Sequence, residues 1–424
     1  MTARSEPGMT PRFGRGSRQF WRLARHLTPE RLNRVLRLRS ASGLPISRSR
    51  FWAMGLPEET VEAVLGHIRS LQGWDLAWTW AAQGFLGESR RHATAGRVRE
   101  AAVARQHAAL SYHAATIGVT DNIKKLRTLR AARTTLFSQA LPVLMPEVTR
   151  VEPVWRASVL PGYLVRPAAG GPTPLVVLLN GSTTAKEETV LWTGPLVAHG
   201  LSVLCLDWPG TGESALELGI TADCDDFTDG VIALARDDPA LDEDSVVLLG
   251  FSLGGALAVQ AAVADRRIAA VVAVSAPYDA SRWLRFASPV MVDHLVATAG
   301  GPDAVDELER RFALTGIAEA LTCPLLVVGA GADLVMPPSE SLRLCAAAGE
   351  NGTLLWFPDE GHGLYDAVEQ WTGDVGRWVR GLFDVTSTPV DPAAALGDPF
   401  ADSLDLDSRD DVAEVAGAPP VRDA

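Results

Sequence analysis

Residues 249–255 read L-G-F-S-L-G-G, which places Ser252 between Gly250 and Gly254, directly after an apolar run. An alanine-rich stretch typical of a helix follows, so we expect the serine on a tight turn from a strand into a helix. Such a turn strains its central residue, and glycines let the flanking backbones pass close to each other. Ser252 is therefore a candidate nucleophile. Because G-x-S-x-G also occurs by chance on ordinary turns, the serine needs partners elsewhere in the chain.

Two further side chains follow strand-like runs and have the right chemistry. A serine hydroxyl is a poor nucleophile, so an imidazole must accept its proton and return it to the leaving group, and His362 can do this. Asp333 would hold the imidazole in the productive tautomer. Asp359 and Glu360 are alternative acids, but they lie too close to His362 in sequence to approach its ring easily. The order Ser252, Asp333, His362 is the chain order of catalytic triads in α/β-hydrolases.

A tetrahedral intermediate also needs two hydrogen-bond donors for its oxyanion. We expect one of them to be the backbone N–H of Leu253, directly after the nucleophile. The second donor is expected in the loop 180–188, N-G-S-T-T-A-K-E-E, with Ser182 as the first candidate and Thr183 as the next. Asn180 opens this loop and is expected to orient it and to lie at the substrate site.

Short apolar runs separated by helical patterns must position these residues. This alternation predicts an α/β-hydrolase fold, a mostly parallel sheet flanked by helices, with the chemistry beyond the carboxyl ends of the strands. Residues 154–165 are expected to form strands with a turn at Pro161-Gly162. The other expected strands are 175–179, 202–206, 245–249, 269–274, 325–328 and 353–357.

The region before residue 147 has the periodicity of helices instead. Trp74, Trp78 and Trp80 form an aromatic cluster there, which either packs in a helical core or lines an apolar pocket for substrate. We predict four segments: a basic extension at 1–50, partly disordered or helical; a helical cap domain at 51–146; a catalytic domain at 147–383; and an acidic disordered tail at 384–424.

Composition excludes several classes of protein. With 424 residues, 47% of them hydrophobic, and a net charge of −12, we expect a soluble globular protein with a large core. The chain has no apolar run long enough for a membrane helix, and its arginine-rich start lacks the apolar stretch of a secretory signal, so a cytoplasmic location is expected. Neither charged end interleaves aromatic residues as a nucleic-acid platform would. The scattered cysteines and histidines predict neither a metal site nor a cofactor.

The motifs N-G-S-T-T-A-K-E-E, D-W-P-G-T-G-E-S, G-F-S-L-G-G, G-A-D-L-V-M-P and E-G-H-G, behind an amino-terminal helical region, resemble one family. They are similar to the fermentation–respiration switch protein-like hydrolases, which include 2,6-dihydroxypseudooxynicotine hydrolase and fungal polyketide chain-shortening hydrolases. The resemblance implies a helical cap over the serine, often a homodimer, and hydrolysis of a carbon–carbon bond beside a ketone in an aromatic or polyketide-like substrate. By motif position, Ser252, Asp333 and His362 carry over as the triad.

These observations predict a cofactor-free serine hydrolase that cleaves a carbon–carbon or ester bond in a small hydrophobic ketone or acyl substrate. An acyltransferase, thioesterase or cyclase with the same triad remains open, because the sequence does not show how well the site excludes water. A binding protein that retains the fold without catalysis is the third hypothesis. Epoxide hydrolases and haloalkane dehalogenases are excluded, since they need a carboxylate where this chain has Ser252.

Overall fold

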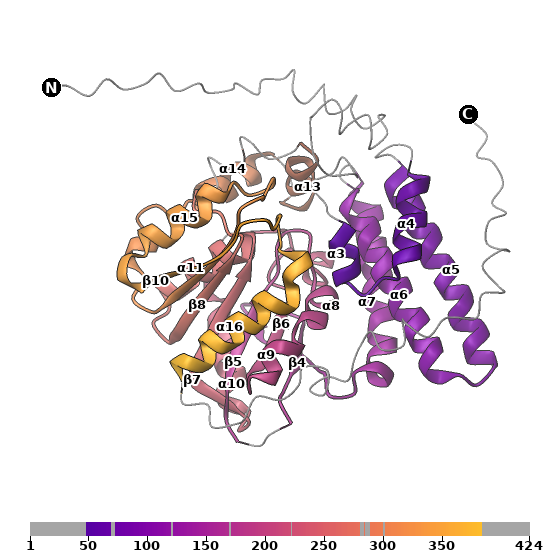
Figure 1. The fold of residues 1–424 in the computed structure, drawn as a ribbon, viewed down its shortest axis with the longest axis horizontal. Coiled ribbons are helices and arrows are strands. Elements are labelled where there is room, and N and C mark those ends of the chain that lie inside the picture. The colour runs from indigo at the N-terminus through magenta and orange to yellow at the C-terminus, as the bar shows by residue number, and fades with distance from the viewer. Residues whose placement is uncertain are drawn as a thin grey trace.

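A twisted eight-stranded sheet forms the centre of the molecule (Figure 1). The computed structural model describes residues 48–68, 73–119, 122–168, 171–221, 223–279, 284, 289–299 and 302–383. The strand order is β1-β4-β6-β5-β7-β8-β9-β10. Neighbouring strands from β6 to β10 run parallel, whereas β4 is antiparallel to both β1 and β6. This is the α/β-hydrolase fold that the sequence predicts.

The strands at the middle of the sheet are apolar along their whole length because helices cover both of their faces. β5, β6 and β8 are buried almost throughout, as is the carboxyl-terminal half of β7. The strands of this sheet are β1 (Thr149–Val151), β4 (Gly162–Val165), β5 (Thr173–Leu179), β6 (Ser202–Leu206), β7 (Leu241–Phe251), β8 (Ile268–Val274), β9 (Leu325–Ala330) and β10 (Gly352–Phe357).

Two hydrophobic cores lie on opposite faces of the sheet. Helices α9 (Gly194–Ala198) and α16 (Val368–Leu382) pack on one face. Helices α10 (Thr228–Asp237), α11 (Leu253–Ala264) and α15 (Pro338–Ala347) pack on the other. Two more helices, α13 (Pro289–Ala299) and α14 (Pro302–Arg311), lie between β8 and β9 in the sequence. With both faces covered, the open positions of the sheet are the loops at its strand ends.

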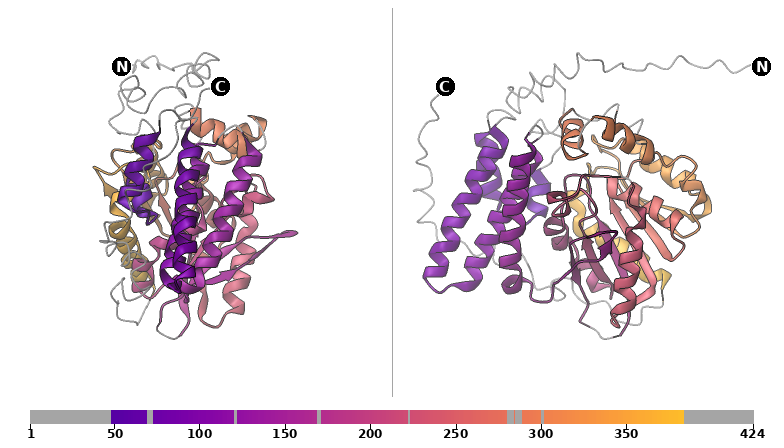
Figure 2. Two further views of the ribbon diagram at one scale, coloured as in Figure 1. Left: turned by 90° about the vertical axis from the view of Figure 1, so that its right-hand side faces the viewer. Right: turned by 180° about the vertical axis from the view of Figure 1, so that it is seen from behind.

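The amino-terminal helices stand beside the sheet (Figures 1 and 2). They are α3 (Arg48–Ala53), α4 (Glu58–His67), α5 (Trp74–Thr94), α6 (Val98–Ile117) and α7 (Ile123–Leu144). The alanine-rich α6 lies between α5 and α7, which is why most of its residues are buried. Asn122 caps α7 by accepting the backbone N–H of Lys125 at 2.9 Å. Among the described helices, none combines the length and apolar character that crossing a bilayer requires.

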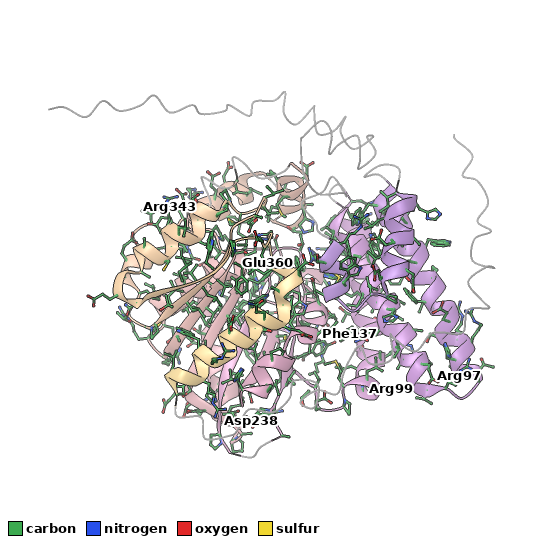
Figure 3. All side chains as sticks on the ribbon, viewed as in Figure 1. Arg97, Arg99, Phe137, Asp238, Arg343 and Glu360 are labelled. Carbon is green, nitrogen blue, oxygen red and sulfur yellow. The ribbon has the colours of Figure 1, made fainter. Side chains whose placement is uncertain are left out.

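The helices and the sheet share a packed interface. Phe137 of α7, labelled in Figure 3, stacks on Tyr163 of β4 with ring centroids 5.9 Å apart. The core on this face of the sheet continues without a break into the helices. The predicted boundary between the basic extension and the helical cap domain, at residue 50, falls inside α3, in which Arg50 is buried. Residues 1–47 of the predicted extension at 1–50, and the predicted tail at 384–424, lie outside the described residues.

The prediction of a turn at Pro161-Gly162 is wrong. The turn lies earlier, at 156–157, where it joins β2 (Val154–Trp155) to β3 (Ser158–Val159) in a small hairpin. Gly162 instead begins β4, where a Cβ atom would lie 2.7 Å from the Leu204 side chain of β6. The glycine permits a close approach of two strands, and the sequence pattern of proline and glycine does not distinguish this from a turn.

Candidate active site

The turn between β7 and α11 holds Ser252 in the strained conformation that its motif predicts. Its φ is 54° and its ψ is −119°, and 7% of its surface is exposed. A Cβ atom on Gly250 would lie 2.1 Å from the Gly254 carbonyl oxygen, and one on Gly254 would lie 2.4 Å from that of Leu179. Side chains do not fit at either position, so the two glycines allow the turn. The backbone N–H of Ser252 donates to the Val274 carbonyl at 2.8 Å, which ties the turn to β8.

Asp333 and His362 meet beyond the ends of β9 and β10. Asp333 Oδ2 lies 2.8 Å from His362 Nδ1. The other carboxylate oxygen, Oδ1, accepts the backbone N–H groups of Val335 at 2.8 Å and Met336 at 2.7 Å. The carboxylate is therefore fixed, and it favours the tautomer with the proton on Nδ1 and a free lone pair on Nε2. The structure pairs His362 with Asp333 and not with the alternative acids Asp359 and Glu360.

The imidazole of His362 lies beside the residue that precedes the serine. Its ring centroid is 5.9 Å from that of Phe251, the last residue of β7. Tyr365 also packs on Phe251, at 6.1 Å. The histidine loop and the serine turn thus share an aromatic contact that holds them side by side.

The loop after β5 passes directly beside the serine. A Cβ atom on Gly181 would lie 3.3 Å from the Ser252 Cβ. The Gly181 N–H donates to Thr184 Oγ1 at 2.7 Å, so this N–H is already engaged. The Ser182 hydroxyl points to the Met291 sulfur at 3.7 Å. These positions favour the backbone N–H of Ser182, rather than its hydroxyl, as the second oxyanion donor.

Thr183 and Asn180 have structural partners. Arg50 of α3 donates to Thr183 Oγ1 at 3.0 Å and to its carbonyl oxygen at 2.9 Å. The Asn180 amide donates to the Leu206 carbonyl at 3.2 Å and to the Asp207 carboxylate. Asn180 is fully buried, so its contacts favour the expected role of orienting the loop over contact with substrate.

Buried charges bind this loop to the amino-terminal helices. Arg50 makes two hydrogen bonds to Glu188, at 3.0 and 2.9 Å, and His113 Nε2 lies 2.8 Å from the same carboxylate. Burial and the nearby Arg133 and Arg50 cations lower the pKa of His113 despite the contact with Glu188. His113 is therefore neutral, and it donates its Nε2–H to Glu188 while Nδ1 faces Arg133.

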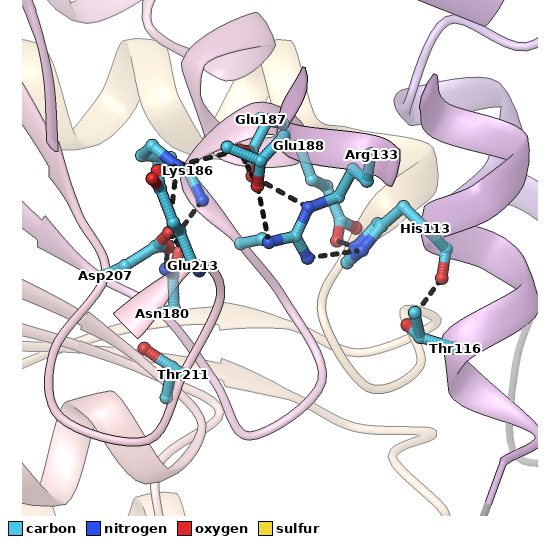
Figure 4. A network of polar contacts seen from close by, with 12 residues as sticks. His113, Thr116, Arg133, Asn180, Lys186, Glu187, Glu188, Asp207, Thr211 and Glu213 are labelled. Carbon is cyan, nitrogen blue, oxygen red and sulfur yellow. Dashed lines mark hydrogen bonds and ion pairs between the residues drawn. The ribbon is translucent and has the colours of Figure 1, made fainter. Parts of the chain in front are cut away.

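A second set of buried charges continues from Glu187 (Figure 4). Glu187 lies 3.1 Å from Arg133 Nε and 2.7 Å from Lys186 Nζ. Lys186 Nζ also contacts Asp207 at 3.2 Å and Glu213 at 2.6 Å. Burial would raise the pKa of Glu187, but the cations of Arg133 and Lys186 lower it to about 2. The carboxylate thus stays charged although water does not reach it.

Sequence reasoning missed the anchors of the loop. Lys186, Glu187 and Glu188 belong to the motif N-G-S-T-T-A-K-E-E, but the sequence pattern assigns them no role, and it assigns none to Arg50 or His113. The signal that could have identified these anchors is the run of three charged residues at 186–188, soon after the apolar run at 175–179. The described residues contain no cluster of three or more histidine, cysteine or acidic side chains that could hold a metal.

Trp74 and Trp78 lie in the core of the helices. Phe51 packs on Trp78 with ring centroids 4.7 Å apart and on Trp74 at 6.0 Å. Trp74 Nε1 donates to the Ala114 carbonyl at 2.8 Å. Both indoles are almost completely buried, whereas Trp80 is exposed. This packing favours the core alternative over contact with substrate for Trp74 and Trp78.

Parts of the amino-acid sequence are similar to known proteins. Residues 211–386 match the prolyl oligopeptidase family. A 2,6-dihydropseudooxynicotine hydrolase of Paenarthrobacter nicotinovorans is 30% identical over 154 residues, which cover 36% of this chain and 42% of that protein. The α/β hydrolase ucsC of an Acremonium species is 35% identical over 166 residues, which cover 34% of this chain and 33% of that protein. The chain thus spans less than half the length of each of these relatives.

A solved structure extends the likeness to most of the fold. The crystal structure of 2,6-dihydroxy-pseudo-oxynicotine hydrolase superposes with a TM-score of 0.69 and 22% identity, covering 81% of this chain and 97% of that one. At this identity the superposition establishes the fold. Together with the sheet order, it shows that the chain has the α/β-hydrolase fold, and the sequence similarities show that parts of it resemble hydrolases of the 2,6-dihydropseudooxynicotine hydrolase type.

Proposed function

We propose that this chain is a serine hydrolase that uses Ser252, His362 and Asp333 to cleave a carbon–carbon bond next to a ketone, or an ester. The 2.8 Å contact between His362 Nδ1 and Asp333, beside a serine on a strained turn, is the observation that carries the proposal. The relatives named as hydrolases support the same reaction class.

In the proposed reaction, Ser252 Oγ attacks the substrate carbonyl while His362 Nε2 accepts its proton. The N–H groups of Leu253 and Ser182 stabilise the resulting oxyanion. Collapse of the intermediate breaks the bond to the leaving group, which takes the proton from His362 and departs as a carbon acid or an alcohol. Water, deprotonated by His362, then releases the acid and restores the serine.

The helices α3–α7 are proposed to act as the cap that limits access to this site. The Arg50 contacts to Thr183 and Glu188 support this role, because they join α3 to the loop beside the nucleophile. The substrate would be a small hydrophobic ketone or acyl compound. An acyltransferase would use the same residues but would pass the acyl group to an added alcohol or amine, which analysis of the products detects.

The first test is labelling by a fluorophosphonate probe, followed by mass spectrometry of the intact protein. We expect one adduct on the wild-type chain and none on Ser252→Ala, because only an activated serine reacts with the probe. Ser138→Ala, which removes the hydroxyl of an exposed serine on α7, is the matched control and should be labelled like the wild type. Equal labelling of wild type and Ser252→Ala, or none of either, would contradict the proposed nucleophile.

A further inference from the structure

Arg130 of α7 is a buried cation without a counter-ion among the described residues. Its side chain is 4% exposed. Its neighbours Arg50 and Arg133 each pair with a glutamate of the loop 180–188, but Arg130 has no ion pair or hydrogen bond to any residue that the structure describes. Buried charges in proteins are normally paired, because removing an isolated charge from water is strongly unfavourable.

The lowered pKa of Arg130 agrees with the lack of a counter-ion among the described residues. Burial and the cations of Arg133 and Arg127 lower its pKa to about 9, and the more distant Asp207 offsets this only in part. In contrast, the paired Arg50 has its pKa raised by Glu188 against the same burial. Arg130 is still protonated at neutral pH, so its guanidinium is a charged donor that lacks an acceptor among the residues described by the structure.

A second unpartnered donor lies close to it. His294 of α13 is 2% exposed, and neither of its ring nitrogens has a hydrogen-bond partner of good geometry within the described part of the chain. Burial and the nearby Arg130 cation lower the pKa of His294 to about 4, and this is offset in part by the backbones of Ser182 and Val119, which approach the ring nitrogens without the geometry of a full hydrogen bond. The imidazole is therefore neutral and can donate one N–H.

The two side chains lie next to the loop that borders the nucleophile. His294 is near the backbone of Ser182, and Met291, one turn earlier on α13, contacts the Ser182 hydroxyl at 3.7 Å. Gly181, the residue before Ser182, borders Ser252. A substrate held at Ser252 by its carbonyl group would therefore extend along this loop toward Arg130 and His294.

We propose that Arg130 and His294 bind a carboxylate group of the substrate, so that the substrate class is a hydrophobic keto acid or an acyl compound with a carboxylate remote from the bond that is cleaved. This inference rests on the proposed function, because it places the carboxylate relative to Ser252. A planar carboxylate accepts two parallel hydrogen bonds from a guanidinium and a further one from an imidazole N–H. It also neutralises a charge that is otherwise buried alone.

Protection from the fluorophosphonate probe tests the inference. The labelling rate of Ser252 is measured with increasing 4-phenylbutanoate and, separately, with 4-phenylbutanamide, which has the same shape without the charge. In the wild-type chain, the acid should protect at a concentration about tenfold or more below that of the amide, the size expected for a charge-assisted hydrogen bond. Arg130→Gln should abolish this difference between the acid and the amide. For each variant, the labelling rate with competitor is compared with the rate of the same variant without competitor.

Matched variants distinguish the possible outcomes. Arg127→Gln removes an exposed cation one turn earlier on α7 and should keep the preference for the acid. Arg130→Lys keeps the charge and should retain part of the preference for the acid. It provides a second variant if Arg130→Gln fails to fold. A wild-type chain that is labelled but shows no preference overturns this inference alone. Protection by inorganic phosphate as strong as by the acid also overturns the assignment to a substrate carboxylate. Absence of labelling overturns the proposed function instead.

Discussion

The Asp333 carboxylate is held by hydrogen bonds on both of its oxygens. One oxygen accepts two backbone N–H groups, and the other faces His362 Nδ1. Both oxygens are engaged, so the carboxylate cannot rotate without losing hydrogen bonds. This arrangement fixes the imidazole ring and its tautomer, which a less constrained acid such as Glu360 would not do.

Substitution of Asp333 by asparagine tests this role. The asparagine amide can donate to His362 Nδ1, which would place the imidazole proton on Nε2, the nitrogen that must accept the serine proton. We expect kcat to fall by about 10³–10⁴-fold with little change in KM. The matched control is Glu360→Gln, which should keep kcat within about threefold of wild type. A large loss in Glu360→Gln with near-normal kcat in Asp333→Asn would instead identify Glu360 as the acid.

At the scale of elements, the Arg50 side chain couples α3 to the loops beside Ser252. The Arg50 guanidinium holds Thr183 and Glu188 on one side, and it lies 5.7 Å from the centroid of the Tyr365 ring on the other. Tyr365 is three residues after His362 and packs on Phe251. The arginine thus contacts both loops that flank Ser252, and it acts as a positioning residue.

Replacement of Arg50 separates positioning from stability. Arg50→Met leaves Glu188 buried without its main cation, so the free energy of unfolding should fall by about 3 kcal/mol or more. The double variant Arg50→Met with Glu188→Gln removes both charges and keeps an acceptor for His113, so it should recover much of this stability. The kcat should remain low in both variants, because Thr183 still lacks its two hydrogen bonds. Urea unfolding and steady-state kinetics measure the two effects. A double variant that recovers kcat together with stability would show that Arg50 has only a structural role.

These elements also show what the sequence can predict. The sequence could predict that Ser252, Asp333 and His362 lie near one another, because parallel strands end at one edge of a sheet, and residues after each strand therefore meet. The contact of Arg50 with Glu188 joins residues 138 positions apart, and no periodicity or motif relates them. The arginine-rich start indicated a solvated extension, whereas tertiary packing buries its last residues in α3.

The whole molecule combines a shared hydrophobic core with an unusual number of buried ionisable groups. The core on one face of the sheet extends into the helices α3–α7, so the two parts are packed as one body. His113 and the charges beside the loop 180–188 lie at this junction, whereas His107 is buried among the amino-terminal helices. Because their protonation differs between the folded and unfolded chain, pH should affect the stability of the molecule as a whole.

Acid should destabilise the protein in two steps. Burial lowers the pKa of His107 to about 4 from its ordinary 6.5. The unfolded chain therefore takes up this proton first, and the stability that depends on a neutral His107 is lost as pH falls from about 6.5 to about 4. Glu187 has its pKa lowered to about 2 from 4.5, so its contribution is lost below about pH 4.5.

Urea unfolding between pH 8 and pH 3, followed by tryptophan fluorescence, measures this dependence. The free energy of unfolding should be highest above about pH 6.5 and should decline below it, with each buried histidine adding up to about 1.4 kcal/mol per pH unit. His107→Gln removes one of these groups and should make the decline between pH 6.5 and 4 shallower. Glu369→Gln, which alters an exposed residue of α16, should leave the curve unchanged. A stability that is flat from pH 8 to pH 4 would contradict this prediction, because it would mean that the buried histidines bind protons equally in the folded and the unfolded chain.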